Sequence, residues 1–287
     1  MRIIVILIRF LALTFVYFCT FAVVSGLLLS TPSQQPNSSE AGTALLALLA
    51  ISVINTAVFT YIILRSRWAG WKLALSIFFV FYGVATLMPQ IETAFFITRL
   101  PPGMLPRLFL AGAIVAAVFS PLAVLILGKV RSQSNDLREP SRLRMPVGAW
   151  VVKLALIAVA YEVIYFTFGY FIAWQSPAVR AYYGGTDPGG FIDQISGLLR
   201  NQPSLFLLQA VRALLWAALA LPVIKMMKGE WWQSALAVAL LFAAVNSQLL
   251  LPNPLMPYDV RMAHLLETAT SNFLFGWLIV VILRKSV

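Results

Sequence analysis

The chain has 287 residues, of which 61% are hydrophobic and 11% charged, and its formal net charge is +11. Soluble domains are nearer half apolar and a quarter charged, so this composition excludes an ordinary soluble domain. At about 20 residues per crossing, the length allows roughly eight to ten transmembrane helices. Apolar residues form continuous runs and do not alternate with polar ones as in a membrane β-barrel, which predicts an all-α integral membrane protein.

Eight apolar segments are predicted to cross the membrane. In chain order they are 3–29, 43–64, 71–96, 108–127, 147–174, 204–224, 234–251 and 264–283. The first follows Arg2 and contains Arg9, as the start of a signal peptide would. It is longer than the apolar region of a typical cleaved signal peptide, so we interpret it as a transmembrane helix.

The basic residues predict the orientation of these helices. Most of the 21 Lys and Arg residues fall near one set of helix ends. Because loops on the cytoplasmic side carry an excess of Lys and Arg, both termini are predicted to be cytoplasmic, in a plasma (inner) membrane. The same rule accounts for the net positive charge, so we expect no nucleic acid as a partner.

Two connections are long and polar. Residues 129–146, KVRSQSNDLREPSRLRMP, are predicted to be a basic cytoplasmic linker between a first half, 1–128, and a second half, 147–287. Residues 175–203 are predicted to be the longest outer loop. Within it, apolar residues from Phe191 to Leu199 recur at helical spacing, which favours a short interfacial helix with Asp193 and Arg200 towards water.

Short matches between the halves suggest an internal repeat. The residues from Arg9 to Tyr17 resemble those from Lys153 to Tyr161 in order and spacing, and Pro89-Gln90 and Pro252-Asn253 close equivalent segments. An even number of crossings in each half would insert both copies in the same orientation. The sequence therefore predicts two tandem four-helix repeats related by an axis along the membrane normal.

Glu162 and Arg212 lie within predicted transmembrane segments, at a similar depth. An isolated charge there would cost about 2.5–3.5 kcal/mol on insertion scales. Because consecutive helices commonly pack side by side, we predict an ion pair between them. The pair could fix helix packing alone, or it could line a substrate or proton pathway.

Other polar residues gather towards the predicted outer ends of three helices. They are Glu92 in 71–96, Asn246 and Gln248 in 234–251, and Arg261, His264, Glu267 and Asn272 at the start of the last helix. A shared water-filled cavity open to the outside would reconcile them with lipid. Scattered interhelical hydrogen bonds are the alternative. His264 and Glu267, three residues apart, could share a ligand or form a hydrogen-bonded couple.

Motifs for nucleotide binding, serine hydrolysis and metalloprotease chemistry are missing from the sequence. One cysteine, Cys19, excludes an intrachain disulfide and a thiolate cluster. One histidine cannot build a zinc site with several His ligands. We therefore expect neither a cofactor nor a resident metal.

The prediction for function is a small-solute transporter or permease, since secondary transporters combine repeats with polar sites near the membrane midplane. Two alternatives remain open. One is an intramembrane enzyme that uses Glu92, His264 and Glu267, and the other is a non-catalytic subunit or assembly factor. The expected partners are the lipid bilayer and an unknown small solute, with a membrane-protein partner or a second copy of the chain left open.

Overall fold

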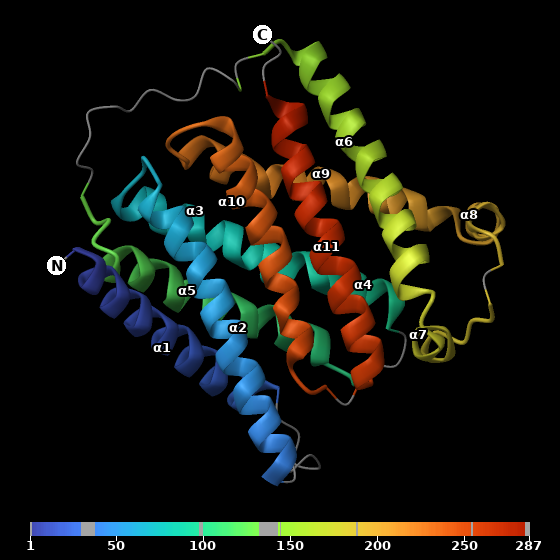
Figure 1. The fold of residues 1–287 in the computed structure, drawn as a ribbon, viewed down its shortest axis with the longest axis horizontal. Helices are drawn as coiled ribbons and strands as arrows, with labels where there is room; N and C mark the ends of the chain where they lie inside the picture. The colour runs from blue at the N-terminus through green and yellow to red at the C-terminus, as the bar shows by residue number, and fades with distance from the viewer. Residues whose placement is uncertain are drawn as a thin grey trace.

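The computed structural model describes residues 2–29, 38–97, 100–131, 143, 145–187, 189–253 and 255–284. Most of the linker predicted at 129–146 lies outside the described residues. The described residues form helices, joined by turns and one isolated β-bridge. Figure 1 shows the chain from the N-terminal helix in blue to the C-terminal helix in red.

Within the described residues, eight helical spans are long and apolar enough to cross a membrane, which confirms an all-α membrane protein with eight transmembrane helices. Four lie in the first half and four in the second. In chain order, the elements that build them are α1 (Arg2–Leu28), α2 (Ser38–Leu64), α3 (Gly70–Tyr82) with η1 (Gly83–Leu87) and α4 (Met88–Phe96), α5 (Met104–Ile126), α6 (Val147–Phe168) with η3 (Gly169–Ala173), α9 (Pro203–Met226), α10 (Trp231–Ala244) with η4 (Val245–Leu250), and α11 (Tyr258–Leu283).

Two further helices, α7 (Pro177–Tyr182) and α8 (Phe191–Asn201), lie between α6 and α9. The helix α8 occupies the segment in which the apolar spacing predicts an interfacial helix. The six-residue helix α7 has no counterpart in the sequence prediction. It packs against α11, and its Val179 is fully buried beside Val260.

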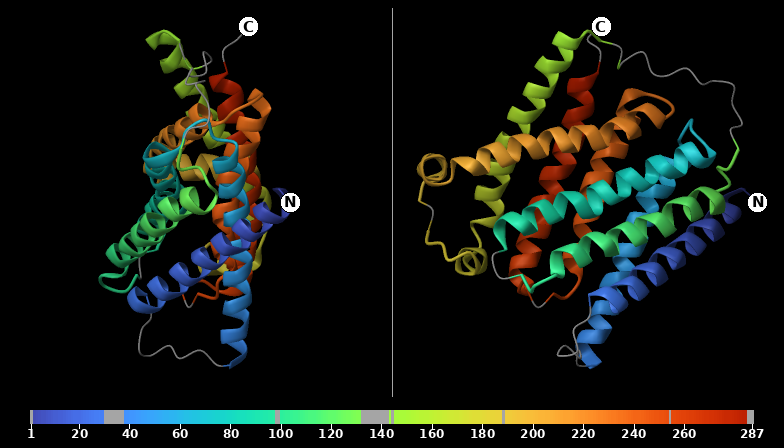
Figure 2. Two further views of the ribbon diagram at one scale, coloured as in Figure 1. Left: turned by 90° about the vertical axis from the view of Figure 1, so that its left-hand side faces the viewer. Right: turned by 180° about the vertical axis from the view of Figure 1, so that it is seen from behind.

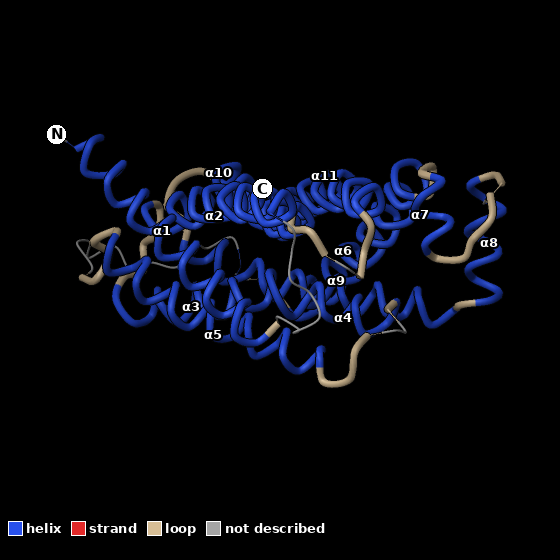
Figure 3. The backbone as a smooth tube through the Cα atoms, turned by 90° about the horizontal axis from the view of Figure 1, so that it is seen from below, coloured by secondary structure: helices blue, strands red, loops and turns tan. Residues whose placement is uncertain are grey.

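The transmembrane helices form two layers that cross each other (Figure 2, right, and Figure 3). One layer contains, side by side, α1, α5, α3 with α4, and α9. The other contains, side by side and in the equivalent order, α6, α11, α10 and α2. Each layer therefore holds three spans from one half of the chain and one from the other, because α2 and α9 are exchanged.

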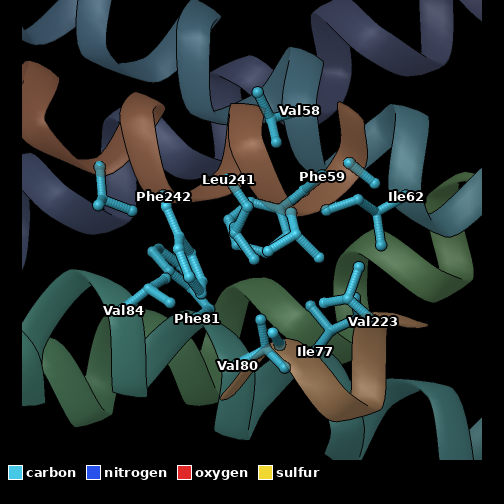
Figure 4. Packing of buried hydrophobic residues seen from close by; sticks show 14 of the residues in the cluster. Val58, Phe59, Ile62, Ile77, Val80, Phe81, Val84, Val223, Leu241 and Phe242 are labelled. Atoms are coloured by element: carbon cyan, nitrogen blue, oxygen red, sulfur yellow. The ribbon is translucent and has the colours of Figure 1, made fainter. Parts of the chain in front are cut away.

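The core lies where the layers cross. Figure 4 shows Phe59 and Ile62 of α2 packed among Val80 and Phe81 of α3 and Leu241 of α10. Outward-facing apolar side chains, such as those along α1, stay exposed. In lipid, burial of apolar surface does not drive helices together, so close packing and interhelical hydrogen bonds must hold the layers.

A proline explains the break in the third span. Pro89 has no backbone N–H, so the carbonyl of Ala85, four residues earlier, loses its helical partner. The helix widens there into the π-helix η1, and the side-chain amide of Gln248 donates to the Ala85 oxygen at 3.3 Å. The sequence prediction took this span as one continuous helix and missed the break.

A similar break closes the seventh span. There α10 tightens into the 3₁₀-helix η4, whose last carbonyls face no further helical turn. Arg261 of α11 satisfies them, since its Nη1 donates to the carbonyl oxygens of Leu249 and Leu251 at 2.8 and 2.5 Å.

At the opposite end of the bundle, the turns that follow α2 and α9 are joined by the isolated antiparallel bridge of Ser66 with Met227. Arg67 N donates to Met226 O, and Lys228 N donates to Arg65 O. We call this the basic end. The turn from α2 into α3 needs glycine, because Gly70 has a φ of 57° and an added Cβ would lie 2.7 Å from the Val130 oxygen.

At the basic end, each half has the same kind of hydrogen bond. Arg9 of α1 donates to the carbonyl of Leu127 just after α5, and Lys153 of α6 donates to the carbonyl of Arg284 just after α11. Buried positions also recur at a constant spacing along α5 and α11, and these are Ala111, Val115, Phe119 and Ala123 against Glu267, Ser271, Phe275 and Ile279.

Candidate functional site

A buried ion pair joins the two halves of the chain. Nη1 of Arg212, on α9, lies 2.5 Å from Oε1 of Glu92, on α4, and 2.7 Å from Oε1 of Gln209, one turn earlier on its own helix. Arg212 lies about 13–14 Å along α9 from Pro203, which is close to the middle of a 30 Å hydrocarbon layer. The charge is therefore deep in the span.

The exposure of the two partners differs. The side chain of Arg212 is 4% exposed, whereas that of Glu92 is 33% exposed. Glu92 thus neutralises the buried guanidinium through one oxygen, while part of its own side chain stays exposed.

The prediction that Arg212 pairs with Glu162 is wrong. Glu162 on α6 is half-buried, and the described residues offer it no ion pair or hydrogen bond. Its neighbour Tyr161 faces the site instead, with its ring centroid 5.7 Å from the Arg212 guanidinium. Adjacent residues on a helix point about 100° apart, so Glu162 faces away when Tyr161 faces in.

The error lies in the face of α6 that is turned to α9. The two consecutive spans do pack together, but Tyr161 and not Glu162 faces Arg212. The prediction assumed that the partner of Arg212 lies on the preceding span. In the structure α9 lies beside the third span of the other half, so Glu92 of α4 reaches it.

Two buried donors at the pair have no hydrogen-bond acceptor among the described residues. They are Nε of Arg212 and Nε2 of Gln209, whose side chain is fully buried. An unmatched buried donor costs about 1–3 kcal/mol. Such groups in native proteins call for an explanation, and one explanation is function.

A second cluster lies at the start of α11. Nδ1 of His264 lies 2.8 Å from Oε2 of Glu267, and its Nε2 lies 3.2 Å from the hydroxyl of Tyr183, which follows α7. Both ring nitrogens are therefore engaged. The side chains of His264 and Glu267 are 19% and 10% exposed, so the couple lies mostly inside the protein.

The two clusters are electrostatic neighbours. Burial raises the pKa of the Tyr183 hydroxyl, and the charges of Tyr182, Glu92 and Glu267 act in the same direction. Glu92 of one cluster thus acts on the tyrosine of the other. We call the combined set the Glu92–His264 site.

Both π-helices adjoin this site. The π-helix η1 leads directly into α4 and Glu92. In η3, a Cβ added to Gly169 would lie 3.7 Å from Oε1 of Glu267. Single π turns inside α-helices are frequent at functional sites, so their position supports function here.

Three other predicted site residues donate their side-chain hydrogen bonds to backbone carbonyls. Asn246 donates to the carbonyls of Phe242, Ala243 and Thr268. Gln248 and Arg261 donate to the carbonyls left without helical partners at η1 and η4. These bonds hold helix ends. Asn272 is half-buried further along α11, outside both hydrogen-bonded clusters. A single cavity that joins all of these residues stays a prediction.

Sequence reasoning missed Gln209, Tyr161 and Tyr183. The spacing of Gln209 and Arg212, three residues apart on a predicted helix, was an available signal. Tyr183 could not be found in this way, because only the folded chain brings a loop residue to His264. Within the described residues, no three His, Cys, Asp or Glu side chains converge closely enough to hold a metal ion.

No protein-family model matches the chain, and comparisons with curated proteins and with solved structures also found no match. The site must therefore be interpreted from its own residues.

Proposed function

We propose that this membrane protein is a transporter of a small polar solute, and that the solute binds at the Glu92–His264 site. The observation that carries the proposal is the ion pair of Glu92 with Arg212. Arg212 lies near the middle of its span, the pair joins one half of the chain to the other, and Glu92 stays partly exposed. Secondary transporters place their substrate sites near the midplane between repeats.

The proposal includes a duplication of the two halves, 1–128 and 147–287. Equivalent helices pack in the same order within the two layers, and the bridge of Ser66 with Met227 joins equivalent turns. These features support a two-fold relation about an axis along the membrane normal. Motion of one layer against the other would then open and close a site between them.

We also propose that the basic end faces the cytoplasm and that the protein resides in the plasma membrane. Lys129 donates to the Ser66 carbonyl at this end, and burial together with the positive charge of Lys228 lowers the pKa of Lys129. Such a concentration of basic residues is typical of the cytoplasmic side.

Cysteine labelling tests this orientation after Cys19 has been replaced. A cysteine at Thr186, which is exposed between α7 and α8, should react with an impermeant thiol reagent on whole cells. A cysteine at Glu230, exposed before α10, should react only after the membrane is opened. The reverse pattern would overturn the orientation.

Transport is tested with purified protein in proteoliposomes on a solid-supported membrane, which records charge movement when a solute is applied. The solutes are amino acids, organic acids, polyamines and sugars, because the spare donors of Arg212 and Gln209 favour acceptor oxygens while the Glu92 carboxylate favours amines. We expect a current with at least one class, lost in Glu92→Gln. Glu162→Gln, at a carboxylate outside the site, should keep it.

An intramembrane enzyme is the second candidate, favoured by the couple of His264 with Glu267 and Tyr183. Such a chain can act in general acid–base catalysis. Chemical turnover of an applied solute, without its accumulation in the vesicles, would replace the transporter by an enzyme. If the protein neither binds nor moves any solute, the remaining alternative is a non-catalytic subunit.

A further inference from the structure

The hydrogen bonds of His264 run in one direction, from the segment after α7 into the membrane. Tyr183 belongs to that segment, His264 follows at the start of α11, and Glu267 lies one turn deeper. A carboxylate accepts hydrogen bonds and cannot donate them when it is ionised. Nδ1 of His264 therefore carries the hydrogen towards Glu267, which leaves the Nε2 lone pair to accept from the Tyr183 hydroxyl.

The hydroxyl of Tyr183 is suited to this role. Its pKa is raised by burial and by the nearby carboxylates, so it keeps its proton at neutral pH. The neighbouring Tyr182 points its hydroxyl elsewhere, to the carbonyl of Leu255 at 2.7 Å. Of these two tyrosines, only Tyr183 contacts the imidazole.

The charged groups around His264 favour one additional positive charge. Glu267 on its own helix contacts it, and Glu92 of α4 acts on it from the neighbouring cluster. Glu92 is paired with Arg212 of α9, while Arg261 of α11 is bound to the carbonyls of η4. With His264 neutral, Glu267 is the one carboxylate of the Glu92–His264 site without a cationic partner.

On the remaining neighbours, Lys153 of α6 and Arg180 of α7 donate to backbone carbonyls, Glu162 of α6 faces away, and the titratable side chains that face the site are tyrosines. From α6, Tyr165 interacts electrostatically with Glu92, Glu267 and Arg212, and Tyr161 stacks near Arg212. The end of α7 brings Tyr182, and Tyr183 follows directly after it. From α10 and η4, the polar groups near α11 are the neutral Asn246 and Gln248.

We propose that Tyr183, His264 and Glu267 form a proton-binding site, and that a proton bound there is the coupling ion of the proposed transporter. Tyr183 passes its hydroxyl proton to Nε2 of His264 and takes a proton from water on the loop side. The imidazole becomes an imidazolium and donates through Nδ1 to the Glu267 carboxylate. The net change is one proton bound, with no covalent bond to a heavy atom formed or broken.

The coupling role rests on the proposed function, whereas the proton-binding step does not. His264 is the only histidine in the chain, so ¹⁵N-histidine labelling gives one imidazole in the spectrum. We would record its two ¹⁵N signals in lipid nanodiscs between about pH 5 and 8, the range in which an imidazole changes charge. The signals should move from the neutral to the imidazolium positions over this range.

Matched variants show whether the chain of hydrogen bonds is responsible. Glu267→Gln should keep the signals at the neutral positions down to about pH 5, because a buried imidazolium without its carboxylate is costly. Glu162→Gln should titrate like the wild type. Tyr183→Phe should shift the Nε2 signal of the neutral form, because a hydrogen bond is lost, while Tyr182→Phe should leave it in place.

Signals that stay at the neutral positions throughout in the wild type would overturn proton binding, whatever the transport assay gives. If His264 titrates, the coupling is tested on the solid-supported membrane. The solute current should then depend on an imposed pH gradient, and a current indifferent to that gradient would overturn the coupling. If His264 titrates but the protein transports nothing, the proposed function is overturned and proton binding stands.

Discussion

Two aromatic clusters occupy corresponding places in the two halves of the molecule. In the first half Tyr17 of α1 packs on Phe21 and on Phe119 of α5, with ring centroids 6.2 and 5.4 Å apart. In the second half, Tyr161 of α6 packs on Tyr165 and on Phe275 of α11, at 6.2 and 4.6 Å. The scaffold is alike, but the surroundings differ.

Around Tyr17 the neighbours are apolar, with Phe59 and Phe81 closing the cluster. Around Tyr161 they include the guanidinium of Arg212, and the charged Glu92 and Glu267 lie near. A protein that needed only stability would fill both places with apolar groups. The second cluster keeps charges that are expensive in a membrane, and this difference supports the proposed site.

The largest expected effect tests the common scaffold. Phe119→Ala and Phe275→Ala each remove a fully buried ring, so each should lower the free energy of unfolding by about 3–5 kcal/mol. Thermal unfolding in lipid nanodiscs would measure both. Losses that differ by more than twofold would show that the two clusters do not carry equal structural weight.

The ion pair gives the next effect. Glu92→Leu leaves the buried Arg212 without a carboxylate and should cost about 3–5 kcal/mol. Arg212→Leu leaves Glu92, which is partly exposed, and should cost less, about 1–3 kcal/mol. The double variant should recover much of the loss, because it leaves no unpaired charge. Glu162→Leu should be close to neutral, and a loss as large as that of Glu92→Leu would contradict the assignment.

The number and type of helices could be predicted from the sequence because each span is an uninterrupted apolar run. The ends agree within a few residues for most spans, for example 43–64 against Ser38–Leu64. Pro89 marks the break at η1 in the sequence, although the prediction did not use it. The contacts that complete the breaks at η1 and η4 could not be predicted in the same way. They depend on Gln248 and Arg261 reaching carbonyls on other segments, and no local pattern records those contacts.

The sequence singled out four of the residues in the candidate site, but it missed three others and did not predict the pairing of Arg212 with Glu92. Glu92, Arg212, His264 and Glu267 all stand out as polar groups within apolar helices. Which of them meet depends on the exchange of α2 and α9 between layers, which spacing along the chain cannot reveal. The contact of His264 with Glu267 is local, at three residues' separation, and was the one couple that sequence could place.

A smaller effect tests the likeness of the basic ends. Arg9→Met and Lys153→Met each remove a charged donor from the carbonyl at the end of a helix, and each should cost about 1 kcal/mol. Lys225→Met, in the last turn of α9, serves as the control. Equal losses for Arg9 and Lys153 would strengthen the two-fold relation, and a loss in only one would weaken it.

The smallest effect separates the two tyrosines. The hydroxyl of Tyr17 is buried without a hydrogen-bond partner, so Tyr17→Phe should stabilise the protein by about 1 kcal/mol. The hydroxyl of Tyr161 is not left buried without a partner in this way, so Tyr161→Phe should bring no such gain. Thermal unfolding of the two variants side by side would measure the difference, and a gain in both would remove the distinction.

The exchange of α2 and α9 determines whether the two halves of the chain can separate. Neither half can be lifted off the other as a unit, because α2 would have to be drawn out of the layer of α10 and α11, and α9 out of the layer of α3 and α5. The halves are interlocked by their packing, so the covalent linker between them is not what keeps them together. A protease cut within residues 132–142 should leave two fragments that migrate as one particle in mild detergent and separate only on unfolding.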